Sequence, residues 1–229
     1  MPAFDVPDRD GYFDRWSELH LGYDPRGAFW PRTWLTLTYY CAKPLVRLGV
    51  APDAITLAGG AISAAVPVLA LAGGRWLLLA VAVIVASGLV DNLDGAVAAM
   101  TGRATPLGYV LDSVVDRVSD GCYLLALWLA GAPAWVCVLG GVVTMLHEYI
   151  RARAIGAGMS EVGTVTVSER PTRVIVTAFA LCGAGVLPAR AALAVTVGAA
   201  AWLALGTVGL GQVAVAVRRT LRPGRSTRP

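Results

Sequence analysis

Long intervals of this sequence contain no charged residue, and they constrain the fold more than any other feature. Examples are residues 61–74, 76–90, 122–146 and 174–188. A helix that crosses the hydrocarbon core of a bilayer needs about 20 predominantly apolar residues. The mean hydropathy of +0.64 is also higher than that of an ordinary soluble domain. The sequence therefore predicts an all-α integral membrane protein.

Turn-forming and charged segments divide the apolar sequence into six predicted transmembrane helices. They cover residues 52–73, 76–100, 107–130, 134–157, 169–187 and 191–217. With the N-terminus inside, only Arg75 and Arg190 of the nineteen basic residues fall in outer turns. Because cytoplasmic loops of membrane proteins are enriched in Lys and Arg, we expect a multi-pass protein of the cell membrane with both termini cytoplasmic.

The rest of the chain flanks this six-helix domain, which we place at residues 50–217. Residues 1–31 are predicted to be a polar cytoplasmic arm with a short amphipathic piece at 12–21, and residues 218–229 a basic cytoplasmic tail. Residues 32–49 mix aromatic side chains with Lys43 and Arg47, which is typical of an amphipathic helix in the membrane interface. We expect Pro44 to interrupt this helix and do not count it as a span.

Composition argues against two other classes of function. The net charge of +4 comes almost wholly from arginine, with Lys43 the only lysine, and is weak evidence for a nucleic-acid partner, so we expect none. The four cysteines lie far apart, without the spacing of a metal site. We expect them to be small core residues.

Four carboxylates stand where one apolar run ends and the next begins. Asp91 and Asp94 are three residues apart, and Asp112 and Asp116 are four apart, so each pair projects from one face of a helix. The linking segment, residues 101–106, is short enough to make the two helices antiparallel neighbours. Clustered carboxylates raise each other's pKa unless a cation neutralises them, and hard oxygen ligands suit Mg²⁺ or Mn²⁺.

Two further readings of the four carboxylates remain open. Acids at helix ends can be solvated caps, and acids within a membrane can line a cation pathway, which would make this a non-enzymatic cation-binding or transport protein. Gly95 and Gly108 favour a ligand site, because glycine lets a ligand or another helix approach the backbone closely. We therefore predict a divalent-metal site that binds a diphosphate.

The same stretch resembles the signature of the CDP-alcohol phosphotransferase family, which is DxxDGxxAR, eight residues, then GxxxDxxxD. Every spacing matches, and the matching residues are Asp91, Asp94, Gly95, Ala98, Gly108, Asp112 and Asp116. Ala99 stands where the family usually has arginine. The resemblance also covers the six-helix plan and residues 50–56, and so extends over about residues 50–217.

This resemblance implies a reaction and a set of site residues. Asp91, Asp94 and Asp112 would hold two Mg²⁺ or Mn²⁺ ions, with Asp116 contacting the second ion and acting as the general base. A hydroxyl of the acceptor would attack the β-phosphorus of a CDP-linked lipid, and CMP would leave. The expected CDP-binding residues are Pro52, Asp53, Thr56, Asp91, Gly95, Ala98, Arg103 and Gly108. Arg103, about one helical turn after Ala99, is the candidate substitute for the missing arginine, and a homodimer is typical of the family.

Four arginines are the candidate ligands of a phosphorylated acceptor. Arg151 and Arg153 end the fourth predicted span, and Arg170 and Arg173 begin the fifth. Basic residues there can simply orient the spans, but Arg also offers planar, multi-donor contacts to phosphate oxygens. The segments resemble the YIKARA and ERPxR pieces of the phosphatidylinositol-phosphate synthase branch, with Arg151 in place of lysine.

The resemblance favours CDP-diacylglycerol as the donor and inositol phosphate as the acceptor. Glycerol 3-phosphate or another alcohol remains an alternative acceptor. Two neighbouring residues are assigned other roles: we expect Asp120 to be a polar helix residue rather than a metal ligand, and His147 to be structural.

Overall fold

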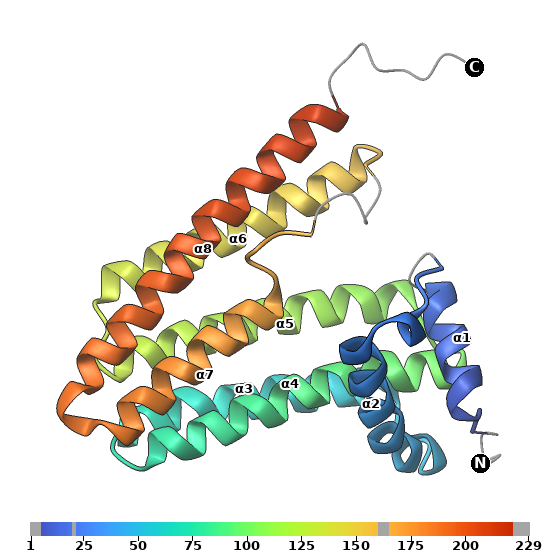
Figure 1. Ribbon diagram of the computed structural model, residues 1–229, viewed down its shortest axis with the longest axis horizontal. Coiled ribbons are helices and arrows are strands. Elements are labelled where there is room, and N and C mark those ends of the chain that lie inside the picture. Colours follow the sequence, from blue (N-terminus) through green and yellow to red (C-terminus); the bar gives the residue numbers. More distant parts are fainter. Residues whose placement is uncertain (1–5, 20–21, 160–164, 222–229) are drawn as a thin grey trace. The chain divides into compact units, whose positions relative to one another are not determined.

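The computed structural model describes residues 6–19, 22–159 and 165–221, and its regular elements in these ranges are all helices (Figure 1). Parts of the predicted arm (1–5 and 20–21), of the loop before the fifth span (160–164) and of the basic tail (222–229) lie outside the described residues. In chain order the helices are α1 (Arg9–Leu19), η1 (Pro25–Gly27), α2 (Phe29–Arg47), α3 (Pro52–Ala72), α4 (Trp76–Thr101), α5 (Pro106–Leu129), α6 (Ala134–Gly156), α7 (Arg170–Val186), η3 (Pro188–Arg190) and α8 (Ala191–Thr220). The all-α prediction is confirmed.

Three helical segments in the described ranges are long and apolar enough to cross a membrane. They are α3, α4 and the stretch Pro188–Thr220, which contains η3 and α8. The other three predicted spans also form helices, but α5 and α6 carry several charged side chains and α7 has only 17 residues. The number of membrane crossings therefore remains a prediction.

Helix α2 corrects one expectation, because it runs through Pro44 to Arg47 without a break. Proline inside a helix costs about 3 kcal/mol. The buried stripe of α2 continues on both sides of Pro44, with Tyr39 and Ala42 before it and Val46 after it. Burial of an apolar side chain contributes about 1.5–3 kcal/mol, so packing on this stripe offsets the cost of the proline.

The chain divides into two compact units, and helices α3, α4 and α5 contribute to both. The first unit consists of Met1–Ser63 and Val85–Ser119, and the second of Ala64–Ile84 and Asp120–Pro229. In the first unit, α1 packs on α2, and the rings of Tyr12 and Tyr39 stack with centroids 5.8 Å apart. Arg15 Nη1 also donates a hydrogen bond to the Met100 carbonyl at 2.6 Å. Helix α1, which overlaps the predicted amphipathic piece at 12–21, thus packs within the first unit.

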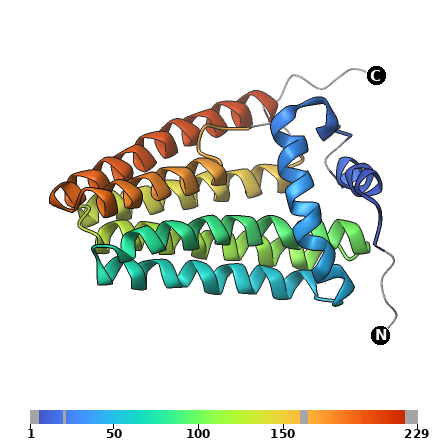
Figure 2. The ribbon, with the colours of Figure 1, turned by 60° about the horizontal axis from the view of Figure 1, so that its bottom comes forward.

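The second unit has its own apolar core, to which six helices contribute. Helices α7 and α8 lie side by side, as do α6 and α8 (Figures 1 and 2). The largest fully buried side chain here is Trp202 of α8, whose indole N–H donates to Thr144 Oγ1 of α6 at 3.0 Å. This packing holds α6 and α7, which carry the four candidate acceptor arginines.

Candidate functional site

Three of the four signature aspartates come together in the first unit. Asp91 of α4 and Asp112 and Asp116 of α5 each place one carboxylate oxygen within 4.8 Å of the others. All three are partly buried. The helical spacing of the acids and the short α4–α5 connection produce this convergence, as the sequence predicts. The cluster has the donor chemistry that Mg²⁺ and Mn²⁺ require.

Asp94 lies outside this three-residue cluster and has different partners. Its side chain is 7% exposed. It accepts a hydrogen bond from Thr56 Oγ1 of α3 at 2.5 Å and another from the Gly95 backbone N–H at 2.6 Å. Asp94 therefore connects α4 to α3.

A cavity of about 310 Å³ opens beside these acids in the same unit. Seven of the eight expected CDP-binding residues line it, and Asp91 instead belongs to the carboxylate cluster. The lining residues are Pro52, Asp53, Thr56, Asp94, Gly95, Ala98, Arg103, Ala104, Thr105, Gly108, Tyr109 and Asp112. Asp112 belongs to both the cavity and the carboxylate cluster. A ligand in the cavity can therefore reach a metal held by the acids.

The two signature glycines play different structural roles. A Cβ added at Gly95 would meet no heavy atom within 4 Å, so this position faces open space. A Cβ at Gly108 would lie 3.1 Å from both Asp53 Oδ1 and Thr105 Oγ1. Gly95 keeps room free in the cavity, whereas Gly108 allows α5 to approach the start of α3.

Sequence analysis did not identify Ala104, Thr105 and Tyr109 as cavity residues. A local signal was present for Thr105, because it precedes Pro106 at the start of α5 and its Oγ1 accepts a hydrogen bond from the Gly108 N–H at 2.9 Å. Threonine before a helix that begins with proline is typical of an N-cap. That signal places Thr105 at a helix start but does not show that it lines a cavity.

Asp116, the expected general base, is partly buried at the edge of the first unit. Its Oδ2 lies 3.4 Å from Arg117 Nη2. The carboxylate is thus close to one cation as well as to Asp91 and Asp112. Because one carboxylate oxygen of Asp116 belongs to the carboxylate cluster, Asp116 can act both as a metal ligand and as a proton acceptor.

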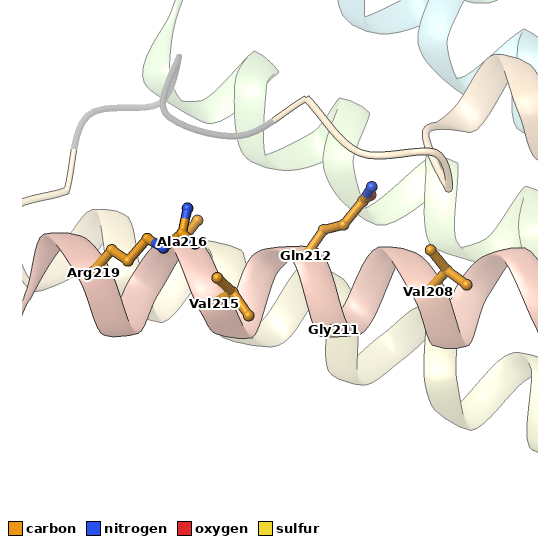
Figure 3. Close-up of a pocket in the computed structure, with 6 residues that line it drawn as sticks. All are labelled: Val208, Gly211, Gln212, Val215, Ala216 and Arg219. Atoms are coloured by element: carbon orange, nitrogen blue, oxygen red, sulfur yellow. The ribbon is translucent and has the colours of Figure 1, made fainter.

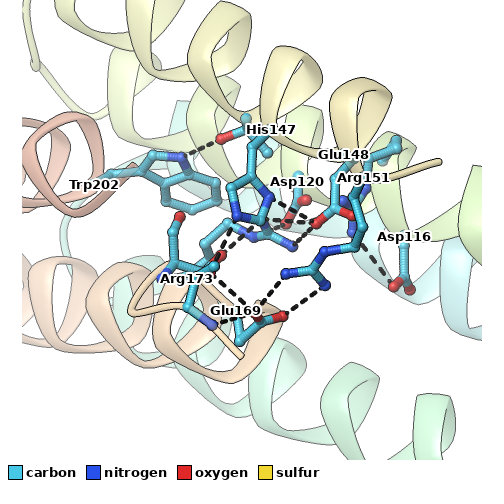
Figure 4. A network of polar contacts seen from close by, with 12 residues as sticks. Asp116, Asp120, His147, Glu148, Arg151, Glu169, Arg173 and Trp202 are labelled. Atoms are coloured by element: carbon cyan, nitrogen blue, oxygen red, sulfur yellow. Dashed lines mark hydrogen bonds and ion pairs between the residues drawn. The ribbon is translucent and has the colours of Figure 1, made fainter. Parts of the chain in front are cut away.

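The candidate acceptor arginines lie in the second unit and differ in their surroundings. Arg151 donates to both oxygens of Glu169, from Nη1 at 3.1 Å and from Nη2 at 2.6 Å (Figure 4). Arg153 is exposed, and Arg170 is partly exposed.

Arg173 is buried, with a side chain only 3% exposed. It lies 3.4 Å from Asp120 Oδ1 and 3.5 Å from Glu148 Oε1, and it donates to the Ser168 carbonyl at 3.0 Å (Figure 4). Asp120, which we expect to be a polar helix residue rather than a metal ligand, thus forms a buried ion pair. Arg173 joins α5, α6 and the segment before α7.

His147 is fully buried, as a structural histidine would be. Its Nε2 lies 3.1 Å from Thr166 Oγ1, and its Nδ1 lies 3.4 Å from Glu148 Oε1. Sequence analysis found neither Thr166 nor Glu169 as a partner of the arginines. Both precede α7, and Glu169 is the first residue of ERPxR, with Thr166 three residues before it.

A second cavity follows one face of α8 and has a volume of about 470 Å³. The residues that line it are Val208, Gly211, Gln212, Val215, Ala216 and Arg219 (Figure 3). Gln212 Oε1 also accepts a hydrogen bond from the Val167 N–H at 3.0 Å. Sequence analysis assigned this face no ligand.

Comparison with known proteins identifies close matches to both the sequence and the fold. Residues 49–217 match the family described as CDP-alcohol phosphatidyltransferase. The phosphatidylinositol phosphate synthase of Mycobacterium marinum is 36% identical over 152 residues, which are 63% of this chain and 62% of that protein. The alignment thus spans slightly less than two thirds of that relative.

Two crystal structures of the Mycobacterium tuberculosis phosphatidylinositol phosphate synthase have the same fold. One, with CDP-DAG bound, has a TM-score of 0.68 at 29% identity and covers 85% of this chain and 98% of that chain. The other, in complex with manganese and citrate, has a TM-score of 0.67 at 30% identity and covers 84% and 93%.

Proposed function

Since this chain belongs to the CDP-alcohol phosphatidyltransferase family, we propose that it transfers the phosphatidyl group of CDP-diacylglycerol to a hydroxyl of inositol phosphate and releases CMP. The observation that carries this proposal is the position of Asp112. It is both a member of the carboxylate cluster and part of the cavity lining. A donor diphosphate in this cavity would therefore lie within reach of a metal held by the acids.

The carboxylate cluster fits a divalent cation. Three partly buried carboxylates with oxygens within 4.8 Å of one another repel each other strongly unless positive charge is supplied. Mg²⁺ or Mn²⁺ would be held by Asp91, Asp112 and Asp116. Asp94, the second aspartate of the signature, would complete a site for two ions. When bound, the cations neutralise charge that develops on the diphosphate.

The residues of the cavity bind and orient the donor in this proposal. The carboxylate of Asp53 and the hydroxyl of Thr56 offer polar contacts to the cytidine, and Gly95 leaves room for it. Arg103 supplies a guanidinium to the phosphates, which is the contact that arginine makes best. Ala98 and Gly108 line the same cavity without bulky side chains.

Asp116 removes the proton of the attacking hydroxyl. The hydroxyl oxygen forms a bond to the β-phosphorus as the bond from that phosphorus to the bridging oxygen breaks, and CMP leaves with the bridging oxygen. A positioned general base contributes roughly 10²- to 10⁴-fold to the rate of such a step. In this proposal the phosphate of the acceptor is bound by arginines, namely Arg151, Arg153, Arg170 and Arg173.

The comparisons support inositol phosphate over the other acceptors. The M. marinum relative is a phosphatidylinositol phosphate synthase, and the relative from Methanothermobacter thermautotrophicus, 34% identical over 134 residues, is an archaetidylinositol phosphate synthase. CDP-DAG and manganese are bound in the similar crystal structures. Glycerol 3-phosphate would require the same phosphate contacts and is the alternative acceptor.

The proposal extends to the membrane. Helices α3 to α8 form six spans in the cell membrane with both termini and the site on the cytoplasmic side, and α2 lies in the interface. Trp30 and Tyr40 of α2, which are 78% and 60% exposed, are side chains typical of that interface. The chain acts as a homodimer. Reporter fusions at the turns containing Arg75 and Arg190 test the topology, because both turns would be external.

The test of function is an assay of the purified chain with CDP-diacylglycerol and Mg²⁺ or Mn²⁺. Inositol phosphate, glycerol 3-phosphate, inositol and serine are compared as acceptors, with CMP and the lipid product measured by mass spectrometry. We expect CMP release with inositol phosphate alone. Release with glycerol 3-phosphate instead would reassign the acceptor, and ion flux without any CMP release would favour a transport protein.

A further inference from the structure

The guanidinium of Arg151 is held in one orientation by Glu169. Each terminal nitrogen donates to a different carboxylate oxygen, at 3.1 and 2.6 Å (Figure 4). A two-point contact of this kind fixes the plane of the guanidinium as well as its position. Arg151 lies in the last turns of α6, and Glu169 directly precedes α7. The pair thus joins two segments of the second unit.

Thr166 in turn fixes Glu169. Its backbone N–H donates to Glu169 Oε1 at 2.8 Å, and its hydroxyl donates to the same oxygen at 2.9 Å. Thr166 is only 6% exposed, so water does not compete freely for these contacts. Glu169 is therefore oriented from both sides, by Thr166 and by Arg151.

The proton of the Thr166 hydroxyl determines the direction of the remaining contacts. Because the hydroxyl has one proton and gives it to Glu169, it must accept from its other partners. These are the Ser168 N–H at 3.3 Å and Nε2 of His147 at 3.1 Å. Nε2 of the fully buried His147 therefore carries a hydrogen. Donation thus runs from His147 through Thr166 to Glu169, and Glu169 also accepts from Arg151 on its other side.

We infer that Thr166 is a positioning residue for the phosphate of the acceptor. This inference rests on the proposed function, in which Arg151 binds that phosphate. Thr166 acts through Glu169, which orients the guanidinium before the acceptor arrives. A free arginine side chain loses rotamer entropy when it binds a ligand, and a side chain fixed in advance loses less of it. Loss of the Thr166 hydroxyl should weaken binding of the acceptor and not of the donor.

The test compares Thr166→Val, which removes the hydroxyl at similar volume, with Thr166→Ser, which retains it. CMP release by the full chain gives kcat and separate KM values for inositol phosphate and CDP-diacylglycerol. We expect Thr166→Val to raise the KM for inositol phosphate about tenfold, as the loss of one hydrogen bond to a charged group predicts. The KM for CDP-diacylglycerol should stay unchanged, and Thr166→Ser should keep both KM values near those of the wild type.

A matched control is available in the same unit. Thr177 is fully buried, and its hydroxyl donates to the Arg173 carbonyl one turn earlier in α7. Thr177→Val removes a buried hydroxyl at similar volume in the same unit, but one that donates to a backbone carbonyl and not to Glu169. We expect it to leave both KM values as in the wild type.

If Thr166→Val does not fold, Glu169→Gln provides the decisive measurement. The amide can still accept from Thr166, but it cannot receive both guanidinium nitrogens of Arg151. We expect the same selective rise in the KM for inositol phosphate. Titration calorimetry of inositol phosphate into the full chain with Mn²⁺ gives the same comparison without turnover.

The outcomes separate this inference from the proposed function. An active wild type whose acceptor KM is unchanged by Thr166→Val, or whose two KM values rise together, overturns the positioning role and leaves the function standing. A lower acceptor KM also overturns it, because Glu169 would then compete with the phosphate for Arg151. A wild type inactive with every phosphorylated acceptor overturns both.

Discussion

Replacement of Gly95 by alanine should have opposite effects on stability and on donor binding. Gly95 lies within α4, and a Cβ there would meet no heavy atom within 4 Å. Alanine is favoured over glycine inside a helix by roughly 0.5–1 kcal/mol, and nothing in the fold opposes the added methyl group. For a chain of this length, a gain of 1 kcal/mol raises the melting temperature by roughly 2–4 °C.

The same methyl group projects into the 310 Å³ cavity that Gly95 lines. Overpacking typically costs about 1–3 kcal/mol, which corresponds to a loss of binding of about 5-fold to 150-fold. We therefore expect Gly95→Ala to raise the KM for CDP-diacylglycerol within this range. The KM for inositol phosphate should not change. The assay is CMP release at saturating concentrations of one substrate and varied concentrations of the other, together with thermal unfolding of the same preparations.

Gly121→Ala is the matched control. Gly121 is an exposed residue within α5, and a Cβ there also meets no heavy atom within 4 Å. It should give the same gain in stability and no change in either KM. A KM for CDP-diacylglycerol within twofold of the wild-type value in Gly95→Ala would refute the assignment of this cavity to the donor. An equal rise in Gly121→Ala would show that the effect is not local.

Three further perturbations test the two groups of charged residues. Asp116→Asn removes the proposed general base and should lower kcat for CMP release by about 10²- to 10⁴-fold. An unchanged kcat would exclude Asp116 as the base. EDTA should abolish turnover and lower the melting temperature, because the carboxylates of Asp91, Asp112 and Asp116 repel each other without a cation. Added Mg²⁺ or Mn²⁺ should restore turnover and the melting temperature, and activity that survives chelation would argue against a metal site. Arg173→Ala removes the guanidinium that forms the buried ion pair with Asp120 and should reduce the free energy of unfolding by about 3–5 kcal/mol. Denaturant titration measures this change, and a loss below about 1 kcal/mol would contradict the structural role of Arg173.

The helices were predictable because the sequence marks their ends chemically. Helices α3 and α5 begin with Pro52 and Pro106, where a missing N–H costs nothing. Helix α4 ends at Thr101, and the next residue, Gly102, has a φ of +66°, which glycine adopts without strain. The prediction failed at Pro44 because a local rule about proline does not include the burial of residues on both sides of it.

The candidate site was predictable only in part, because sequence spacing gives the face of a helix but not the partner that lies against it. The spacing of Asp112 and Asp116 correctly places both acids on one face. It could not show that Asp94 bonds to Thr56, which is 38 residues away on another helix. Likewise, Asp120 and Arg173 form their ion pair across 53 positions of the chain. Such pairs depend on how helices pack, which no local pattern encodes.

Ala99, which breaks the family signature, has a physical explanation in the first unit. Ala98 lines the cavity, and an α-helix turns about 100° per residue, so Ala99 points away from Ala98; it belongs to the core instead and is only 5% exposed. It belongs to the same core cluster as Tyr12 of α1 and Tyr39 of α2.

Helix α1 also reaches this turn of α4 directly, through the hydrogen bond from Arg15 to the Met100 carbonyl. An arginine at position 99 would have to place a long charged side chain in a core to which α1 contributes two aromatic rings, and burial of an unpaired charge is among the costliest changes in a fold. Arg103, about one turn later, lines the cavity instead. The small residue at position 99 thus permits the packing of α1, and a cation for the donor phosphates is still available from the next turn.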